Sequence, residues 1–291
     1  MHRRPRLSPG RVTVLVVGVL VVVLGAGLVL VDRSSPAPRY ASEELIDAHD
    51  PDLSLTVDPA RKSYAAQITS TFENSTLELQ YDYVEDIGDG RGLTAGRAGF
   101  TSGTSDLLLL VQRYTQVEPE NELAKYIPAL EQVDGTDSTE GLDGFAEDWA
   151  EAARDPEQRQ LQDDLVDELY FEPAMTLAAD AGIETPLGQA IFWDTMIQHG
   201  AGGPNGTRAI IDETQEEFGD VGEDEPAWLD AFLDVRLDHM VGLYADMTEE
   251  AAESSESRID ALRSLVYDGE LALQPPLTWQ VYGEEFTLSG P

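Results

Sequence analysis

The sequence predicts a mainly α-helical (α+β) protein with one small β element. Apolar residues recur at helical spacing, as Tyr64, Ile68 and Phe72 do at i, i+4 and i+8. Proline and glycine separate several further segments of helical length. The stretch 81–94 differs, because glycines interrupt an acidic run there and favour tight turns over helix. We expect the small β element at this stretch.

The first 57 residues are expected to precede the folded domain. Four arginines come before Val12–Val31, twenty residues without a charge. This run is long enough to span a bilayer, and the basic flank favours an N-terminus on the inner side. Residues 1–31 are therefore predicted to be a signal peptide or a membrane anchor, and both predict that residues 32–291 leave the cytoplasm. Turn-forming residues and weak periodicity make residues 32–57 a predicted linker or N-terminal arm.

The folded domain, residues 58–291, is predicted to begin with a helix. Asp58 can cap this helix with Pro59 in its first turn, and the apolar stripe ends directly before Glu73. The C-terminal residues 271–288 combine a Pro-Pro pair with an alternating tail, and no helix is predicted there. Later helices are predicted over residues 105–116, 118–133, 144–154, 156–180 with a break near Pro173, 186–199, 226–247 and 249–267.

The chain is strongly acidic. Among 291 residues, 56 are Asp or Glu and 18 are Lys or Arg, which gives a formal net charge of −38. Without the four arginines of residues 1–31, 14 basic residues remain against 56 acidic ones, a net charge of −42. Such a surface repels nucleic acid and anionic lipid and attracts polycations. Adaptation to high salt, where screening weakens self-repulsion, is an alternative cause that the sequence leaves open.

Several kinds of chemistry have little support in the residues. The chain has no cysteine, which excludes disulfides and thiolate catalysis. Its four histidines are scattered and no HExxH motif occurs, so metal catalysis is not predicted. No Gly-x-Ser-x-Gly elbow or Walker motif is present. Carboxylate chemistry remains, and glycoside hydrolysis needs two carboxyl groups in different environments.

Two acids, sixteen residues apart, fit that requirement. Glu73 ends the first helix at the edge of the core, where the helix dipole and some desolvation favour the protonated form that a general acid needs. Asp89 lies between Gly88 and Gly90, in a turn expected to hold its side chain toward solvent. An isolated acid at a helix end or in a turn more often has an ordinary surface role than a catalytic one. The motifs around Glu73 and Asp89 favour the catalytic role for these two.

Eight short runs carry a resemblance to a known family. They are ENS (73–75), YVEDIGDGRG (83–92), GFTSGTSD (99–106), LAKYIPAL (123–130), LYFEP (169–173), HG (199–200), FLDVR (232–236) and PPLTW (275–279). In this order they resemble the chitosanases of glycoside hydrolase family 46, over about Asp58 to Leu288.

The resemblance implies a lysozyme-like, two-lobed, mostly helical fold with the substrate cleft between the lobes. It also implies an endo-acting enzyme that cleaves the β-1,4 bonds of chitosan with inversion and without a metal or other cofactor. Residues 58–291 would then form a chitosanase catalytic domain. Chitosan is a polycationic polysaccharide, which agrees with the acidity of the chain.

The resemblance also implies a role for each matching residue. It implies Glu73 as the general acid, Asp89 as the base that activates water, and Thr94 as a residue that helps to hold this water. Substrate-binding positions are implied for Arg91, Asp106, Glu85 and Asp86. A supporting ionic network behind the site, which tunes the acid, is implied for Asp194, Arg236 and Arg258.

Two other functions remain open at this point. One is a related lysozyme-like glycosidase that acts on chitin or peptidoglycan, and the other is a non-catalytic surface protein that binds polycations. The favoured prediction is an extracellular enzyme, secreted or held on the outer face of the membrane by residues 12–31. It is expected to be a monomer that binds chitosan and no nucleic acid, with no membrane contact beyond that possible anchor.

Overall fold

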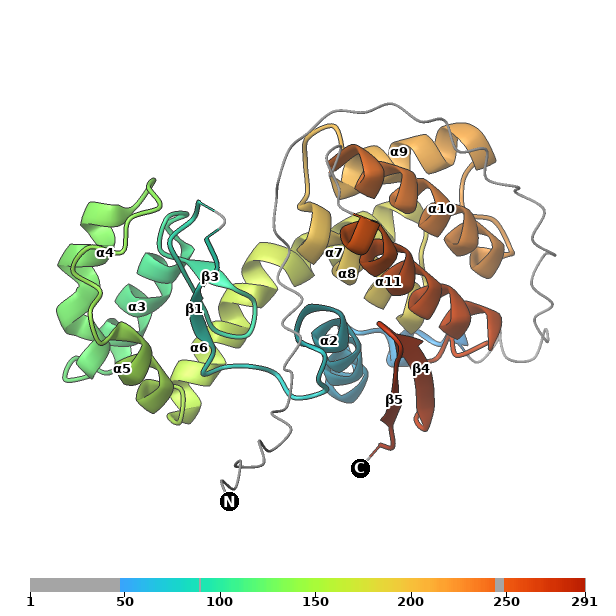
Figure 1. Ribbon diagram of the computed structural model, residues 1–291. Helices are drawn as coiled ribbons and strands as arrows, with labels where there is room; N and C mark the ends of the chain where they lie inside the picture. The colour runs from blue at the N-terminus through green and yellow to red at the C-terminus, as the bar shows by residue number, and fades with distance from the viewer. Residues whose placement is uncertain (1–47, 89, 244–248, 291) are drawn as a thin grey trace, which may run out of the picture.

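Figure 1 shows the computed structural model of the chain, which describes residues 48–88, 90–243 and 249–290. Helices dominate and fall into two lobes, as predicted (Figure 1). The predicted leader, residues 1–31, and the arm up to residue 47 lie outside the described residues. No helix in the described part of the chain is both long and apolar enough to cross a membrane.

The first lobe, at the left of Figure 1, holds a small antiparallel sheet of order β1-β2-β3 and several short helices. In the sheet, Glu85 lies opposite Thr94, and Thr94 lies opposite Thr101. The predicted β element is therefore confirmed, and it extends beyond residue 94. The elements are β1(Val84–Asp86), β2(Leu93–Ala95), β3(Phe100–Thr101), α3(Asp106–Val117), η2(Glu122–Tyr126), α4(Ile127–Val133) and α5(Phe145–Ala152).

The second lobe packs helices around α8, an almost fully buried helix, and adds a β hairpin (Figure 1). Asp58 caps α2 as predicted, since its carboxylate accepts the backbone N–H groups of Ala60 and Arg61. A short 3-10 turn, η1(Pro51–Leu53), precedes this helix. The elements are α2(Pro59–Asn74), α8(Pro186–His199), α9(Thr207–Phe218), α10(Glu225–Leu243), α11(Glu249–Tyr267), β4(Leu277–Val281) and β5(Glu284–Leu288).

Three differences from the predicted elements have physical causes. The helix predicted over 118–133 begins later, because Asn121 caps the 3-10 turn η2 by accepting two backbone N–H groups. The alternating tail forms the hairpin β4–β5, in which Leu277, Trp279 and Val281 point into the core. Helix α9 was not predicted; it has no side-chain cap and buries only a narrow face.

The long helix that joins the lobes contains a π-helical turn. It consists of α6(Pro156–Val166), the turn η3(Asp167–Phe171) and α7(Glu172–Ala181). The predicted break near Pro173 is therefore a change of helix type, with the proline in the first turn of α7. Proline lacks an N–H and its ring clashes with the carbonyl four residues earlier, so a wider turn accommodates it.

Candidate active site

Glu73 lies in the last turn of α2, as predicted. Ile68 and Phe72 anchor that helix, because both are buried in the core. The helix ends where Ser75 adopts a left-handed conformation with φ 51°. The sequence predicts that Glu73 is partly desolvated, but in the structure its side chain is 43% exposed and so loses little contact with water. Instead of a dry pocket, the carboxylate has a charged partner, Arg258, at 2.7 Å.

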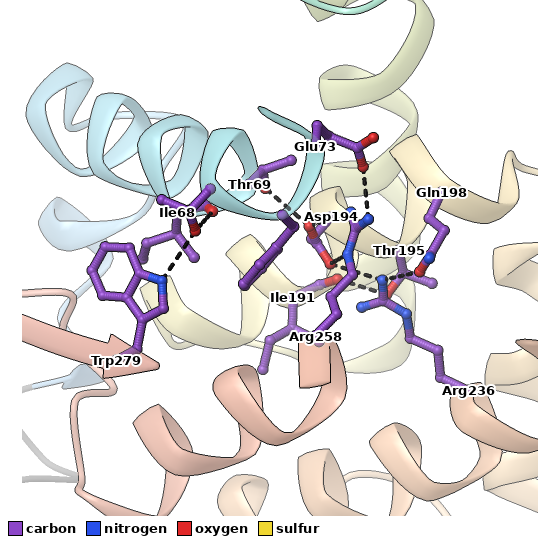
Figure 2. A network of polar contacts seen from close by, with 12 residues as sticks. Ile68, Thr69, Glu73, Ile191, Asp194, Thr195, Gln198, Arg236, Arg258 and Trp279 are labelled. Carbon is purple, nitrogen blue, oxygen red and sulfur yellow. Dashed lines mark hydrogen bonds and ion pairs between the residues drawn. The ribbon is translucent and has the colours of Figure 1, made fainter. Parts of the chain in front are cut away.

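The three residues of the predicted ionic network, Asp194, Arg236 and Arg258, form a chain of ion pairs behind Glu73 (Figure 2). Arg258 Nη1 binds Glu73 Oε1, and the same guanidinium donates to Asp194 from Nε at 3.1 Å and from Nη2 at 2.7 Å. Arg236 Nη2 donates at 2.8 Å to Asp194 Oδ2, the oxygen that also accepts from Arg258 Nε. Thr69, one turn before Glu73 on α2, donates to Asp194 at 3.0 Å. The network therefore joins α2, α8, α10 and α11.

Asp194 carries the negative charge that makes this buried network possible. Burial alone would raise the pKa of Asp194, but the guanidiniums of Arg258 and Arg236 reverse this effect and lower the pKa to about 2. The carboxylate is thus ionised at every ordinary pH. The Arg258 side chain is only 5% exposed, so its charge needs a buried partner. The Asp194 carboxylate supplies that partner and keeps Arg258 beside Glu73.

Two residues beside the network were not predicted as site residues. Gln198 accepts a hydrogen bond from Arg236 Nη2 at 2.6 Å. His199 is buried, and its Nδ1 lies 2.9 Å from the carbonyl oxygen of Asn205, which fixes the proton on Nδ1. Burial, and then the nearby charge of Arg236, lower the pKa of His199 to about 3. The imidazole is therefore neutral in the folded protein. His199 belongs to the matching run HG (199–200), but the resemblance implied no role for it, and Gln198 lies in no matching run.

The neutral His199 predicts a loss of stability in mild acid. The unfolded chain takes up a proton at this histidine below about pH 6.5, whereas the folded chain does so only near its pKa of about 3. Stability therefore falls as the pH drops through this window. Between pH 7 and pH 5 we expect wild type to lose about 2 kcal/mol of unfolding free energy through this residue, and His199→Gln to lose none through it. Urea unfolding at both pH values measures the difference, and parallel losses in both proteins would contradict it.

The acidic turn between β1 and β2 has the predicted backbone. Gly88 and Gly90 have φ of 71° and 85°, the left-handed region that glycine allows, and Asp86 accepts the Gly88 N–H at 3.0 Å. Glu85 accepts the Tyr83 hydroxyl at 2.9 Å, and burial together with this bond raises the pKa of Tyr83 to about 12. The predicted base, Asp89, lies outside the described residues, so its role stays a prediction.

Thr94 lies on β2, the strand that follows this turn. Its side chain is buried, and its hydroxyl finds no hydrogen-bond partner within the described ranges. A buried hydroxyl in a native protein normally has a hydrogen-bond partner, so a further polar group is expected next to the Thr94 hydroxyl. Arg91 lies in the same turn and is exposed. The carbonyl of Arg91 accepts the Gly103 N–H at 2.9 Å, which ties the turn to the loop before α3.

Asp106 begins α3 and organises the loop in front of it. Its Oδ1 accepts three hydrogen bonds, each 2.9 Å long, from the Thr101 N–H, the Thr104 hydroxyl and the Leu107 N–H. Oδ2 receives none of these three. Burial raises the pKa of Asp106, although the three donors oppose that effect. One oxygen thus anchors the carboxylate, and the second stays outside these three hydrogen bonds.

Tyr170, in the π-helical turn η3, connects these predicted residues in space. Burial raises its pKa, the charges of Asp106 and Glu73 add to the effect, and Arg91 opposes it. Its phenol therefore lies within electrostatic reach of one acid from each lobe. Tyr170 was not predicted as a site residue, although it belongs to a matching run, because sequence spacing across a helix does not reveal a π-helical turn.

The described residues bring Glu73, Asp194, Arg236 and Arg258 into direct contact. The charges of Asp106, Arg91 and Glu73 all act on Tyr170, and Thr94, Glu85 and Asp86 lie on the small sheet of the first lobe. Within residues 48–88, 90–243 and 249–290, no three His, Asp or Glu side chains are grouped so that they could hold a metal ion. The arrangement presents one exposed carboxyl group that is held by a buried guanidinium.

Comparison with known families gives one extended match. The model of "Glycosyl hydrolase family 46" matches residues 67–277. Among curated proteins, a chitosanase of Bacillus subtilis (strain 168) is 43% identical over 223 residues, which cover 75% of this chain and 80% of that protein. A chitosanase of a Streptomyces species is 43% identical over 239 residues, covering 80% of this chain and 83% of that protein.

Solved structures give the same result. The chitosanase of Gynuella sunshinyii in complex with chitotetraose matches with a TM-score of 0.71 and 41% identity, covering 79% of this chain and 98% of that one. Native chitosanase from Bacillus subtilis MY002 matches with a TM-score of 0.72 and 40% identity, covering 80% of this chain and 99% of that one. A mutant of the latter was solved with six GlcN units bound.

Proposed function

This chain belongs to glycosyl hydrolase family 46 and is a glycoside hydrolase, and on that premise we propose that it is an exported endo-chitosanase. It hydrolyses the β-1,4 bonds between the glucosamine units of chitosan with inversion at the anomeric carbon. The observation that carries this proposal is the Glu73 carboxyl at the end of α2, exposed to a substrate and paired with a buried arginine. The named activities of the similar chitosanases support the substrate.

In the proposed mechanism, Glu73 donates a proton to the leaving oxygen and Asp89 takes a proton from the attacking water. An inverting enzyme needs room for that water, so its two carboxyl groups lie about 6.5–9.5 Å apart. A helix end in one lobe and a turn in the other suit such a separation, with the substrate in a cleft between the lobes. The unpartnered hydroxyl of Thr94 is proposed to hold the water, because it is buried on the strand that follows the Asp89 turn.

The ionic network supports Glu73 after the proton has left. The carboxylate that forms is then a hydrogen-bond acceptor of Arg258, 2.7 Å away. Asp194 offsets part of the Arg258 charge, so that the acid does not face an uncompensated cation before the reaction. The network thus orients the acid and stabilises its product form.

The proposed cleft binds a cationic polymer through carboxylates. Each glucosamine unit carries an ammonium group, which forms short charge-assisted hydrogen bonds with carboxylate oxygens. Glu85 and Asp86 are exposed on β1, and the three loop hydrogen bonds of Asp106 leave its Oδ2 uninvolved. Arg91 is proposed to contact sugar hydroxyls from the same turn.

Asp106 gives a test of substrate binding that is separate from the chemical step. In Asp106→Asn the amide oxygen can still accept the three loop hydrogen bonds, while the charge of the carboxylate is lost. We expect KM for a glucosamine hexamer to rise about tenfold, as for the loss of one charged contact, with kcat reduced less than threefold. Steady-state kinetics measure both. Asp180→Asn, on the exposed end of α7, is the matched control and should leave both constants unchanged. A variant with lower kcat at constant KM would contradict the assignment.

Export, assembly and salt response are part of the proposal. The arginine-flanked run Val12–Val31 supports export with or without cleavage, and residues 58–291 form the catalytic domain after an arm at 32–57. The protein is proposed to act as a monomer. The net charge of −38 supports attraction of chitosan, adaptation to salt, or both. Activity that rises toward molar salt would favour adaptation.

The decisive experiment follows chitosan hydrolysis by NMR. Soluble, largely deacetylated chitosan should yield glucosamine oligomers whose new reducing ends first appear as the α-anomer, because inversion at a β bond produces it. Early appearance of the β-anomer would contradict the inverting mechanism. Oligomers from chitin or peptidoglycan but none from chitosan would instead favour the acetylated polymer as substrate.

A further inference from the structure

Tyr282 joins the two elements that carry Glu73 and its arginine. Its hydroxyl donates to the carbonyl oxygen of Phe72 at 3.0 Å, one residue before Glu73. Its backbone N–H donates to Ser257 Oγ at 2.7 Å, one residue before Arg258. The Glu73–Arg258 ion pair then completes a closed ring of contacts. One tyrosine therefore fixes both neighbours of the pair.

The carbonyl that Tyr282 binds is one that the helix itself leaves without a partner. The last four carbonyl groups of an α-helix have no intrahelical N–H to accept, and α2 ends at Asn74. The hairpin makes a second bond to the same turn, because Trp279 Nε1 donates to Thr71 Oγ1 at 3.0 Å. Figure 2 shows Trp279 beside α2, on the hairpin side of the network. The C-terminal hairpin thus caps the turn that carries the acid.

Tyr282 occupies a position in the hairpin that tyrosine normally avoids. Tyr282 and Gly283 form the two-residue loop between β4 and β5, with φ of 55° and 76°. A loop with both residues at positive φ is dominated by Asn, Asp and Gly, and a bulky residue there is an outlier. Strained positions of this kind are kept where the side chain is needed.

We propose that Tyr282 is a positioning residue for the general acid: through the Phe72 carbonyl and Ser257 it sets the orientation of Glu73 against Arg258. The proposal rests on the role of Glu73 put forward above. A carboxyl group must lie close to the leaving oxygen and point at it, and small displacements of a catalytic group reduce the rate strongly. Tyr282 itself touches neither the substrate nor the reacting atoms.

The tyrosine remains a donor throughout the range in which chitosan is soluble. Burial raises the pKa of its hydroxyl, the charge of Arg258 and a hydrogen bond with Ser254 oppose this, and the carboxylates of Glu73 and Asp194 add to it. The phenol therefore keeps its proton in acid and at neutral pH, and the contact with Phe72 does not depend on pH there.

The test uses two substrates that differ in their need for an acid. Chitosan has a poor leaving group and needs its proton, whereas a 2,4-dinitrophenyl glycoside of chitotriose has a leaving group that departs without one. We expect Tyr282→Phe to reduce kcat on chitosan about tenfold with KM within twofold, and to leave kcat on the dinitrophenyl substrate unchanged. The melting temperature should fall by only about 2–4 °C, as for the loss of one hydrogen bond.

Three further variants make the result unambiguous. Tyr267→Phe removes another tyrosine hydroxyl, which binds Asp230 on the outer surface, and should match wild type on both substrates. Glu73→Gln should lose chitosan activity and retain the dinitrophenyl reaction, while Asp89→Asn should lose both. Equal losses of Tyr282→Phe on the two substrates, or wild-type kcat on chitosan, would overturn the positioning role. Chitosan turnover by Glu73→Gln would instead overturn the assignment of the acid.

Discussion

Glu73→Gln should abolish turnover of chitosan, with a fall in kcat of about 10³-fold or more. A general acid contributes about 10²–10⁴-fold to the rate, and the amide cannot donate the proton that the leaving oxygen needs. The fold should persist, because the side chain is 43% exposed and the amide oxygen can still accept the Arg258 hydrogen bond. Reducing ends released from chitosan measure the rate, and circular dichroism and thermal unfolding measure the fold.

Glu78→Gln is the matched control for Glu73→Gln. Glu78 is exposed in the segment after α2, and Glu78→Gln removes the same charge from the same region of the surface. It should keep wild-type kcat. A Glu73→Gln enzyme that retained more than a tenth of the wild-type rate would contradict the role of Glu73. A loss in both variants would point to a general effect of surface charge.

Asp194→Asn should produce the largest loss of stability of any conservative substitution near the site. The asparagine leaves the guanidiniums of Arg258 and Arg236 inside the protein without a counter-ion. Removing one partner of a buried charge network costs about 3–5 kcal/mol. We therefore expect a drop in the melting temperature on the order of 10 °C, together with a loss of activity through Arg258 and Glu73. Denaturant unfolding and chitosan hydrolysis measure the two effects.

The control for Asp194→Asn is an ion pair on the surface. Glu151 pairs with Arg154 on the exposed side of α5, and Glu151→Gln should leave the unfolding free energy within experimental error. The pH dependence gives an independent check. Since the pKa of Asp194 is held at about 2, its contribution to stability is present above about pH 4 and is lost as the pH falls toward 2. An equal melting temperature for wild type and Asp194→Asn at pH 7 would contradict this account.

The parts of the fold that were predicted correctly are those with a strong local signal. Helix α2 has a cap, a proline and an apolar stripe, and the structure reproduces it from Pro59 to the turn at Glu73. Helix α8 was predicted with its observed bounds for similar reasons. Helix α9 lacks a side-chain cap and takes its place from packing against α10, which the sequence does not display. The hairpin β4–β5 was not predicted, because its alternate residues are buried in a core that other segments of the chain form.

Site residues that lie in a recognisable sequence motif could be predicted, whereas residues that only folding brings to the site could not. Glu73, the acidic turn and Arg236 lie in runs that resemble a family, and the same resemblance implied Asp194 and Arg258 outside those runs. Thr69, Gln198, Tyr170 and Tyr282 come from four different elements, and only folding brings them to the network or to Glu73. The exposure of Glu73 also depended on tertiary structure, because a helix end can be covered or open.

The π-helical turn η3 acts as a phase shift in the helix that joins the lobes. Before it, the buried positions follow the α period at residues 158, 162, 165 and 166. That period would bury residue 169 next, yet Leu169 is 38% exposed and the buried series resumes at Phe171, Ala174 and Ala178. The wider turn thus absorbs one residue. Deleting any one residue of 167–170 would therefore restore an unbroken α-helix with α7 still facing the core. Keeping all of these residues but winding them as α-helix would instead rotate α7 by about 100° against α6, so the wide turn fixes how the two halves of the enzyme face each other.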